Sequence, residues 1–328
     1  MSELPFFSRR AFLRQASLGF GSMALTYLLH GDSVRAAESG VDLQPRSGHF
    51  RAKAKSVILL FQNGGPSQVD LFDPKPELQK RDGQKYAQKF ESFQPGSETN
   101  VLMASPLKFR RHGQCGMDFS ELLPSLGSVA DELCMVRSMF SDNNNHPQAM
   151  RCLNTGKIFS GRPTLGAWVG YALGTVNQNL PAYVVLRDPA GYNTTGKLVW
   201  SSGWLPALYQ GTELSATGTP VLNLKPSKPL PAGAREDSLD FLGKLNEAHA
   251  RRFPQESDLE ARIRNFELAA RMQLKAADVL DLKKETTATR KLYGLDNPTT
   301  AGYGLRCLLA RRLVEAGVRF VQVFPPPF

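Results

Sequence analysis

The sequence predicts an α/β sandwich, in which helices cover a sheet, and three observations lead to this fold class. The segment 56–61 begins with Ser56 and continues as an uninterrupted apolar run. Such a run is typical of a strand buried on both faces of a parallel sheet. Strand-like and helix-like segments then alternate along the chain. Polar loops rich in glycine, proline or asparagine end several of these segments sharply. Because open parallel sheets bind ligands at the carboxyl ends of their strands, we look for function in such loops.

Hydrophobic periodicity assigns the remaining elements in chain order. It predicts strands at residues 56–61, 133–139, 182–186 and 318–324. Apolar side chains recur at helical spacing in six further segments, residues 121–132, 148–154, 164–173, 238–252, 255–293 and 300–316. Polar and turn-forming residues dominate 77–117 and 188–235, which are expected to form irregular loops. The sequence thus predicts one α/β domain at 56–328 with a helical insertion at 238–293.

The composition is that of a globular protein. Hydrophobic side chains make up 41% of the 328 residues and charged side chains 21%, which excludes a disordered chain. No uninterrupted apolar stretch reaches the roughly 20 residues of a membrane span. The formal charge is +10, but the basic residues are scattered and no nucleic-acid motif accompanies them. The charge predicts either a solvated basic surface or attraction of anionic substrates and envelope polymers.

Residues 1–36 predict an export signal. Arg9 and Arg10 form a twin-arginine motif, a moderately apolar stretch follows at 16–29, and small residues at 34–36 offer a cleavage site. We therefore expect delivery to the periplasm or cell envelope by the twin-arginine machinery, which exports folded proteins and raises the expectation of a bound metal. No membrane span is expected after cleavage, and residues 37–55, which are polar and basic, are expected to form a linker.

The four cysteines do not form a recognisable metal or redox motif. No Cys-x-x-Cys spacing occurs among Cys115, Cys134, Cys152 and Cys307, which argues against zinc-finger and thioredoxin sites. In an oxidising compartment they could form a disulfide or remain as buried thiols.

The first candidate loop, residues 63–70, follows the strand predicted at 56–61. Its glycines allow backbone N–H groups to approach an anion. Ser67 is a candidate catalytic hydroxyl, and Asp70 could bind a divalent metal ion of unknown identity. The loop lacks the Gly-Lys-Ser/Thr ending of a phosphate-binding P-loop. The alternative is a structural turn.

The second candidate loop, residues 142–147, precedes the helix predicted at 148–154. Helix N-termini attract anions, so Asn145 and, one turn further on, Arg151 are candidate substrate-binding residues. His146 is a candidate metal ligand and a candidate catalytic proton donor. The alternative is a cap of Asn and Asp beside a surface histidine.

A group of aromatic residues lies in the long loop at 188–235. Trp200, Trp204 and Tyr209 are close in sequence and could either stack on a sugar or pack against one another. Sequence alone leaves both possibilities open.

Several motifs resemble the exported bacterial proteins of domain-of-unknown-function family 1501. The most specific is the segment 63–76, directly after the first strand. Similar motifs follow over about 55 to 324, at residues 138–139, 146–147, 155–156, 203–206 and 317–323. The twin-arginine signal also suits this family.

The family is similar in fold to sulfatases and alkaline phosphatases. The resemblance implies a three-layer sandwich and metal-assisted hydrolysis of sulfate or phosphate esters. Sulfatases carry a Cys or Ser nucleophile ten residues before the glycine of a Leu-Thr-Gly motif. In this chain Gly156 ends the similar motif and His146 stands at the nucleophile position. Gln62 and Asn63 replace the strand-end aspartate that binds metal in sulfatases, so Asp70 would have to substitute for it.

The end of the chain departs most from the family. In the family, the strand after Gly317 leads into further strands and a segment with Asp and His ligands. Here residues 324–328 include three prolines, which cannot continue a central strand. The sequence therefore predicts a truncated sandwich with an open sheet edge. The functional hypotheses are an exported ester hydrolase, a non-catalytic envelope protein that binds polysaccharide or a protein partner, and an inactive truncated product.

Overall fold

The computed structural model describes residues 41–86, 101–141, 143, 145–188, 195–215, 231, 233–253 and 257–325. The chain divides into two compact units. The first, which we call the sheet unit, comprises Met1–Phe61 and Asn154–Phe328, and the second, the hairpin unit, comprises Gln62–Leu153. The predicted signal, with Arg9 and Arg10, lies outside the described residues.

A four-stranded parallel sheet forms the centre of the sheet unit. Its strands lie in the order β1 (Val57–Leu60), β6 (Phe320–Val323), β4 (Tyr183–Arg187) and β5 (Thr212–Ser215). Gln322 of β6 lies in register with Leu59 of β1 and Val185 of β4. Parallel pairing requires long crossover connections, which the helices supply. The predicted α/β class is therefore confirmed.

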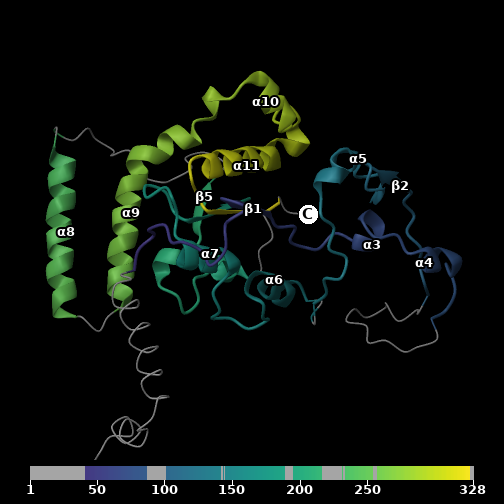
Figure 1. The fold of residues 1–328 in the computed structure, drawn as a ribbon, viewed down its shortest axis with the longest axis horizontal. Helices are drawn as coiled ribbons and strands as arrows, with labels where there is room; N and C mark the ends of the chain where they lie inside the picture. Colours follow the sequence, from purple (N-terminus) through teal and green to yellow (C-terminus); the bar gives the residue numbers. More distant parts are fainter. Residues whose placement is uncertain are drawn as a thin grey trace, which may run out of the picture. The chain divides into compact units, whose positions relative to one another are not determined.

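Helices lie on both faces of this sheet, with α11 above the strands and α7 below them in Figure 1. Successive side chains of β4 point to opposite faces. Leu186 packs in the cluster that includes Leu309 of α11 (Pro298–Glu315). Tyr183 instead faces α7 (Leu165–Leu173), where a Cβ on Gly166 would lie 2.7 Å from its ring. The glycine therefore allows α7 to approach the sheet closely.

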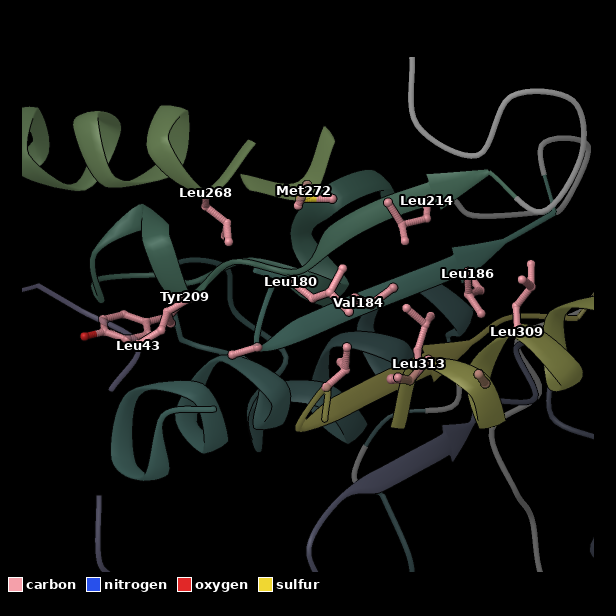
Figure 2. Close-up of a cluster of buried hydrophobic side chains, with 14 of the residues drawn as sticks. Leu43, Leu180, Val184, Leu186, Tyr209, Leu214, Leu268, Met272, Leu309 and Leu313 are labelled. Carbon is pink, nitrogen blue, oxygen red and sulfur yellow. The ribbon is translucent and has the colours of Figure 1, made fainter. Parts of the chain in front are cut away.

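The main apolar cluster joins the sheet to α11 and to α9 (Ser257–Leu280), as Figure 2 shows. Leu268 and Met272 extend from α9 into it. Leu43 also belongs to this cluster, although it lies in the segment 37–55 that we expected to be a linker. Its side chain is only 5% exposed, and its carbonyl accepts a hydrogen bond from Thr175 N at 2.9 Å. This part of the segment contributes to the core.

The helical insertion is more divided than its periodicity predicts. It contains α8 (Ala234–Arg252), α9, the short 3-10 helix η4 (Leu282–Lys284) and α10 (Thr287–Leu292). Two side-chain caps interrupt the helix predicted at 255–293. Asp281 Oδ1 accepts from Lys283 N at 3.0 Å, and Thr286 Oγ1 accepts from Thr289 N at 3.1 Å. Such local bonds compete with continuous helix.

A small antiparallel hairpin distinguishes the hairpin unit. Strands β2 (Phe109–His112) and β3 (Met117–Ser120) pair across a turn whose N–H groups at Gln114 and Cys115 donate to the Asp131 carboxylate. The unit also contains α3, α4, α5, the 3-10 helix η1 and most of α6, which span Gln68–Leu71, Pro76–Lys80, Pro124–Gly127, Ala130–Glu132 and His146–Thr155. Strand β2 and the turn lie inside the segment 77–117 that we expected to be irregular, and β3 begins at its last residue.

Three predictions of local structure were wrong. Residues 133–139 do not form a strand: none of the described strands pairs with this apolar run, and the side chains of Val136 and Met139 are exposed. The helix predicted at 121–132 is reduced to α5 and η1. Strand β1 is not buried on both faces, because it is the edge strand of the described sheet, and Leu60 is 49% exposed.

Candidate functional site

A buried arginine lies at the carboxyl edge of the parallel sheet. Asp188 directly follows the last residue of β4, and Arg306 lies on α11, which packs on the same strand. Helical side chains point back toward the N-terminus of their helix, so Arg306 extends toward this edge. The carboxyl edge is where open parallel sheets place their ligand sites.

Arg306 forms an ion pair with Asp188 that involves only one of its three guanidinium nitrogens. Its side chain is 1% exposed, and its Nη1 atom lies 2.9 Å from Asp188 Oδ2. The Nε and Nη2 atoms are out of contact with solvent and have no hydrogen-bond acceptor among the described residues. The ring of Tyr303, one turn earlier on α11, lies 5.9 Å from the guanidinium carbon. Three of the five N–H groups of this buried cation thus have no acceptor among the described residues.

The open side has a defined shape. Nε and Nη2 form the side edge of the guanidinium plane, whose two parallel N–H groups match two oxygens of a carboxylate, sulfate or phosphate. A buried donor without an acceptor is costly, and native proteins satisfy nearly all such groups. An oxyanion bound at this edge would supply both missing acceptors.

The neighbouring thiol does not provide a nucleophile. Burial raises the pKa of Cys307, although the adjacent Arg306 charge opposes the shift. A thiol with a raised pKa stays protonated near neutral pH and is a poor nucleophile. The chemistry that this edge offers is therefore binding of an anion by Arg306.

A second buried polar network lies on the α7 face of the sheet. The Tyr183 hydroxyl donates to Gln322 Oε1, and Gln322 Nε2 donates to Asn154 Oδ1 at 2.9 Å. All three side chains are buried. Burial raises the pKa of Tyr183 strongly, so its hydroxyl remains a neutral donor. Each of the three side chains finds a partner, which makes this a structural network that ties Asn154 to strands β4 and β6.

The structure brings Ser67 and Asp70 together on the first turn of α3. Ser67 Oγ accepts from Asp70 N at 3.3 Å and so caps this helix. Hydrogen bonds from Ser105 and then Ser67 lower the pKa of Asp70. The carboxylate is therefore ionised at neutral pH, as a metal ligand must be. Ser67 therefore has a structural role as a helix cap, and its catalytic role stays a prediction.

The other predicted residues lie around the start of α6. His146 is exposed at its first residue, and the Asn145 carbonyl accepts from Ala149 N at 2.8 Å. Arg151 Nε donates to Pro147 O at 3.2 Å, back along its own helix. Within the described residues, His, Cys, Asp and Glu side chains do not gather in threes as a metal site would require. No such group includes Asp70 or His146 among the described residues, and the predicted divalent metal stays a prediction.

A pocket that the sequence did not predict lies beside the edge strand β5. Its volume is about 360 Å³, near the lower limit for small-molecule sites. It opens between β5, α9 and the 3-10 helices η2 (Gly196–Trp200) and η3 (Ala207–Tyr209). Its charged lining residues, Lys197 and Glu213, have opposite signs. The pocket therefore does not select an anion or a cation by charge.

Two sequence expectations about compartment can be compared with the structure. Cys115, Cys134, Cys152 and Cys307 are all free thiols, so the structure contains none of the possible disulfides between them. In the part of the chain that the structure describes, every helix is too short or too polar to cross a bilayer.

These features define an α/β protein with a parallel sheet, helices on both faces and a buried arginine at the carboxyl edge. The chain belongs to the family described as "Protein of unknown function (DUF1501)", whose model matches residues 54–327. The resemblance inferred from the motifs is thereby confirmed. No curated protein and no solved structure matches the chain.

The sequence contained signals for this edge that its motifs did not emphasise. Asp188 ends the predicted strand 182–186, and Arg306 is a charged residue between leucines of the helix predicted at 300–316. Neither residue belongs to a recognised motif. Only the fold shows that the two side chains meet.

Proposed function

We propose that this protein binds anionic esters, sulfate or phosphate, at the carboxyl edge of a sulfatase-like and alkaline-phosphatase-like sandwich, and that Arg306 holds the anion. The observation that carries the proposal is the open side edge of the buried Arg306 guanidinium. Asp188 holds the opposite side of the same group at 2.9 Å and fixes its orientation. A guanidinium fixed in this way is preorganised for two-point recognition of an oxyanion.

Two further features support an anionic ligand. The whole chain carries a formal charge of +10, which attracts anions over long range. An anion at the buried edge also loses its water, and charge-assisted hydrogen bonds are stronger where the effective dielectric constant is low. Sulfate and phosphate esters share this chemistry, and both are the substrates that the family resemblance implies.

Ester hydrolysis is a separate, catalytic part of the proposal, and we assign it to the hairpin unit. A divalent metal ion, when bound in the hairpin unit, would polarise an oxygen of an ester that is bound there. Asp70 is the described residue best suited to hold such an ion, because its carboxylate is ionised and lies on an accessible turn. We propose His146 as its second ligand and, failing that, as a proton donor. The described residues give no third ligand.

Anion binding is tested by titrating the purified protein with sulfate and with phosphate in a calorimeter. The variant Arg306→Lys keeps the charge but has no planar side edge, so we expect affinity to fall by at least about tenfold. Arg262→Gln removes one exposed charge from a different helix, α9, and should bind as the native protein does. Equal affinity of native protein and Arg306→Lys would overturn the proposal.

Turnover and metal are measured separately. Metal analysis of native protein, Asp70→Ala and His146→Ala should show a divalent ion that either substitution reduces. Release of nitrophenol from p-nitrophenyl sulfate and phosphate should then fall with the metal content. Anion binding without turnover would favour the non-catalytic alternative, an envelope protein that binds a polysaccharide or a protein partner.

A further inference from the structure

Helix α7 carries large aromatic side chains on the side that faces away from the sheet. Its inward side consists of small residues, Gly166, Ala167 and Gly170, which are buried against the sheet and Tyr209. On its outward side, Trp168 is 41% exposed and Tyr171 is 44% exposed. The helix contains no charged residue at all. An apolar helix surface of this kind in solvent marks an interaction site.

The outward side of α7 continues into the loop that precedes η3. Trp204 is 61% exposed, and its ring lies 6.3 Å from that of Trp168 in an edge-to-face contact. Trp168 and Tyr171 are in a similar contact at 6.0 Å, and Tyr171 leans on the buried Tyr209 at 5.3 Å. Trp168, Tyr171, Trp204 and the neighbouring Arg162 together form what we call the aromatic surface. Its rings hold one another in place, so a ligand would not have to order them.

A cation lies at one end of this row. The guanidinium carbon of Arg162 lies 5.8 Å from the centre of the Trp204 ring. Arg162 forms no ion pair with any described carboxylate. By contrast, Arg46, beside Tyr171, is already paired with Asp42 at 2.9 Å. Arg162 is therefore the cation that is available to an anionic partner.

We propose that the aromatic surface binds an anionic polysaccharide. The C–H faces of its sugar rings would stack on the exposed faces of Trp204 and Trp168, and an acidic substituent would bind Arg162. Aromatic rings in a row, rather than aliphatic side chains, favour stacking of flat ligand faces, and the unpaired guanidinium selects a negative charge. This site is separate from the Arg306 edge, because α7 and α11 lie on opposite faces of the sheet. The inference does not depend on the proposed ester binding.

The test is affinity electrophoresis of the full chain in gels that contain a sulfated galactan or the same galactan after desulfation. We expect retardation by the sulfated polymer, and we expect Trp204→Ala and Arg162→Gln each to weaken binding by about tenfold or more. Phe266→Ala and Arg262→Gln are the matched controls, since each removes an exposed aromatic ring or an exposed charge on α9. These controls should bind like the native protein.

Several outcomes would overturn this inference. Unchanged binding by Trp204→Ala would show that stacking is not involved, and equal binding of the desulfated polymer would remove the role of Arg162. Fluorescence gives a second readout, because the buried Trp200 is shielded while Trp168 and Trp204 should be quenched by acrylamide and protected by the polymer. Protection of both tryptophans in the free protein, or a dimer that Trp204→Ala dissociates, would assign the surface to protein contacts instead. The two proposals can fail separately, because Arg306→Lys should lose ester binding and still bind the sulfated galactan like the native protein.

Discussion

The Tyr183 hydroxyl donates a hydrogen bond to the Gln322 amide oxygen, between neighbouring strands β4 and β6 and out of contact with solvent. Gln322 in turn donates to Asn154 at 2.9 Å. A glutamine in the middle of an apolar strand is tolerated because both ends of its amide are satisfied. The network therefore ties Asn154 to strands β4 and β6.

Replacing Tyr183 by Phe should destabilise the protein by about 1–2 kcal/mol, because the Gln322 oxygen loses its donor in a buried site. The cost should also depend on pH. Burial raises the pKa of Tyr183 above its ordinary value of 10.0, so only the unfolded chain releases this proton just above pH 10. Native stability should then decline above about pH 10, by up to about 1.4 kcal/mol per pH unit. Urea titrations at pH 8 to 11 should show a shallower decline for Tyr183→Phe than for the native protein or Tyr171→Phe.

The Arg306–Asp188 pair makes a second prediction. Asp188→Asn leaves a buried guanidinium without its counter-charge and should cost about 3 kcal/mol. Adding Arg306→Met removes that uncompensated charge and should restore at least half of the loss. A double-mutant cycle in urea measures this coupling. Additive losses from the two substitutions would contradict the buried pair.

Glu285 should make the free energy of unfolding depend on pH in the acidic range. Its Oε1 atom accepts from Arg312 Nη1 at 2.6 Å and from Arg311 Nη2 at 2.7 Å. Hydrogen bonds from Arg312, and then Arg311, lower the pKa of Glu285 below its usual 4.5. The stabilisation is thus present above about pH 4.5 and is lost as the pH falls through the folded-state value. The advantage of native protein over Glu285→Gln should shrink between pH 6 and 3, whereas Glu267→Gln, which removes an exposed pair with Arg264, should show no such trend.

Leu43 tests whether the segment before β1 belongs to the fold. Leu43→Ala should lower the free energy of unfolding by about 2–4 kcal/mol, because it opens a cavity in the main cluster. Leu242→Ala, on the exposed side of α8, should change it by less than about 0.5 kcal/mol. Equal effects in urea denaturation would mean that Leu43 does not pack in the folded protein.

The export prediction is tested in cells. Changing Arg9 and Arg10 to lysine should block the twin-arginine route, so the uncleaved precursor should accumulate in the cytoplasmic fraction. Mature protein should be found in the envelope fraction of cells with the native sequence. Equal amounts of mature protein in both envelope fractions would rule out this signal.

The elements with strong periodicity could be predicted from sequence, and those defined by pairing could not. α7, α11, β4 and β6 all begin and end within two residues of their predicted limits, because their apolar patterns match burial. β5 was missed since its sequence, Thr-Glu-Leu-Ser, places one buried leucine among polar residues. Residues 133–139 show the converse, because an apolar run without a pairing partner does not become a strand.

The candidate sites show the same division. The motif-bearing loop at 63–70 drew attention to Ser67 and Asp70, which share a helical turn, while their roles stay predictions. Arg306 and Asp188 are far apart in sequence, and only the packing of α11 on β4 brings them together. The sequence grouped Trp200, Trp204 and Tyr209 and left open whether they pack or bind a sugar. In the structure Trp200 and Tyr209 are buried, whereas Trp204 is exposed beside Trp168 of α7, which no motif connects to it.

The central claim is that an oxyanion occupies the side edge of Arg306. The most direct measurement is a crystal structure of the protein soaked with tungstate, a tetrahedral anion whose metal scatters X-rays anomalously. The account predicts an anomalous peak beside Nε and Nη2 of Arg306, with tungstate oxygens within hydrogen-bonding distance of both atoms, and no such peak in Arg306→Lys. Crystals with tungstate bound only elsewhere, or with both nitrogens donating to the protein itself, would contradict it.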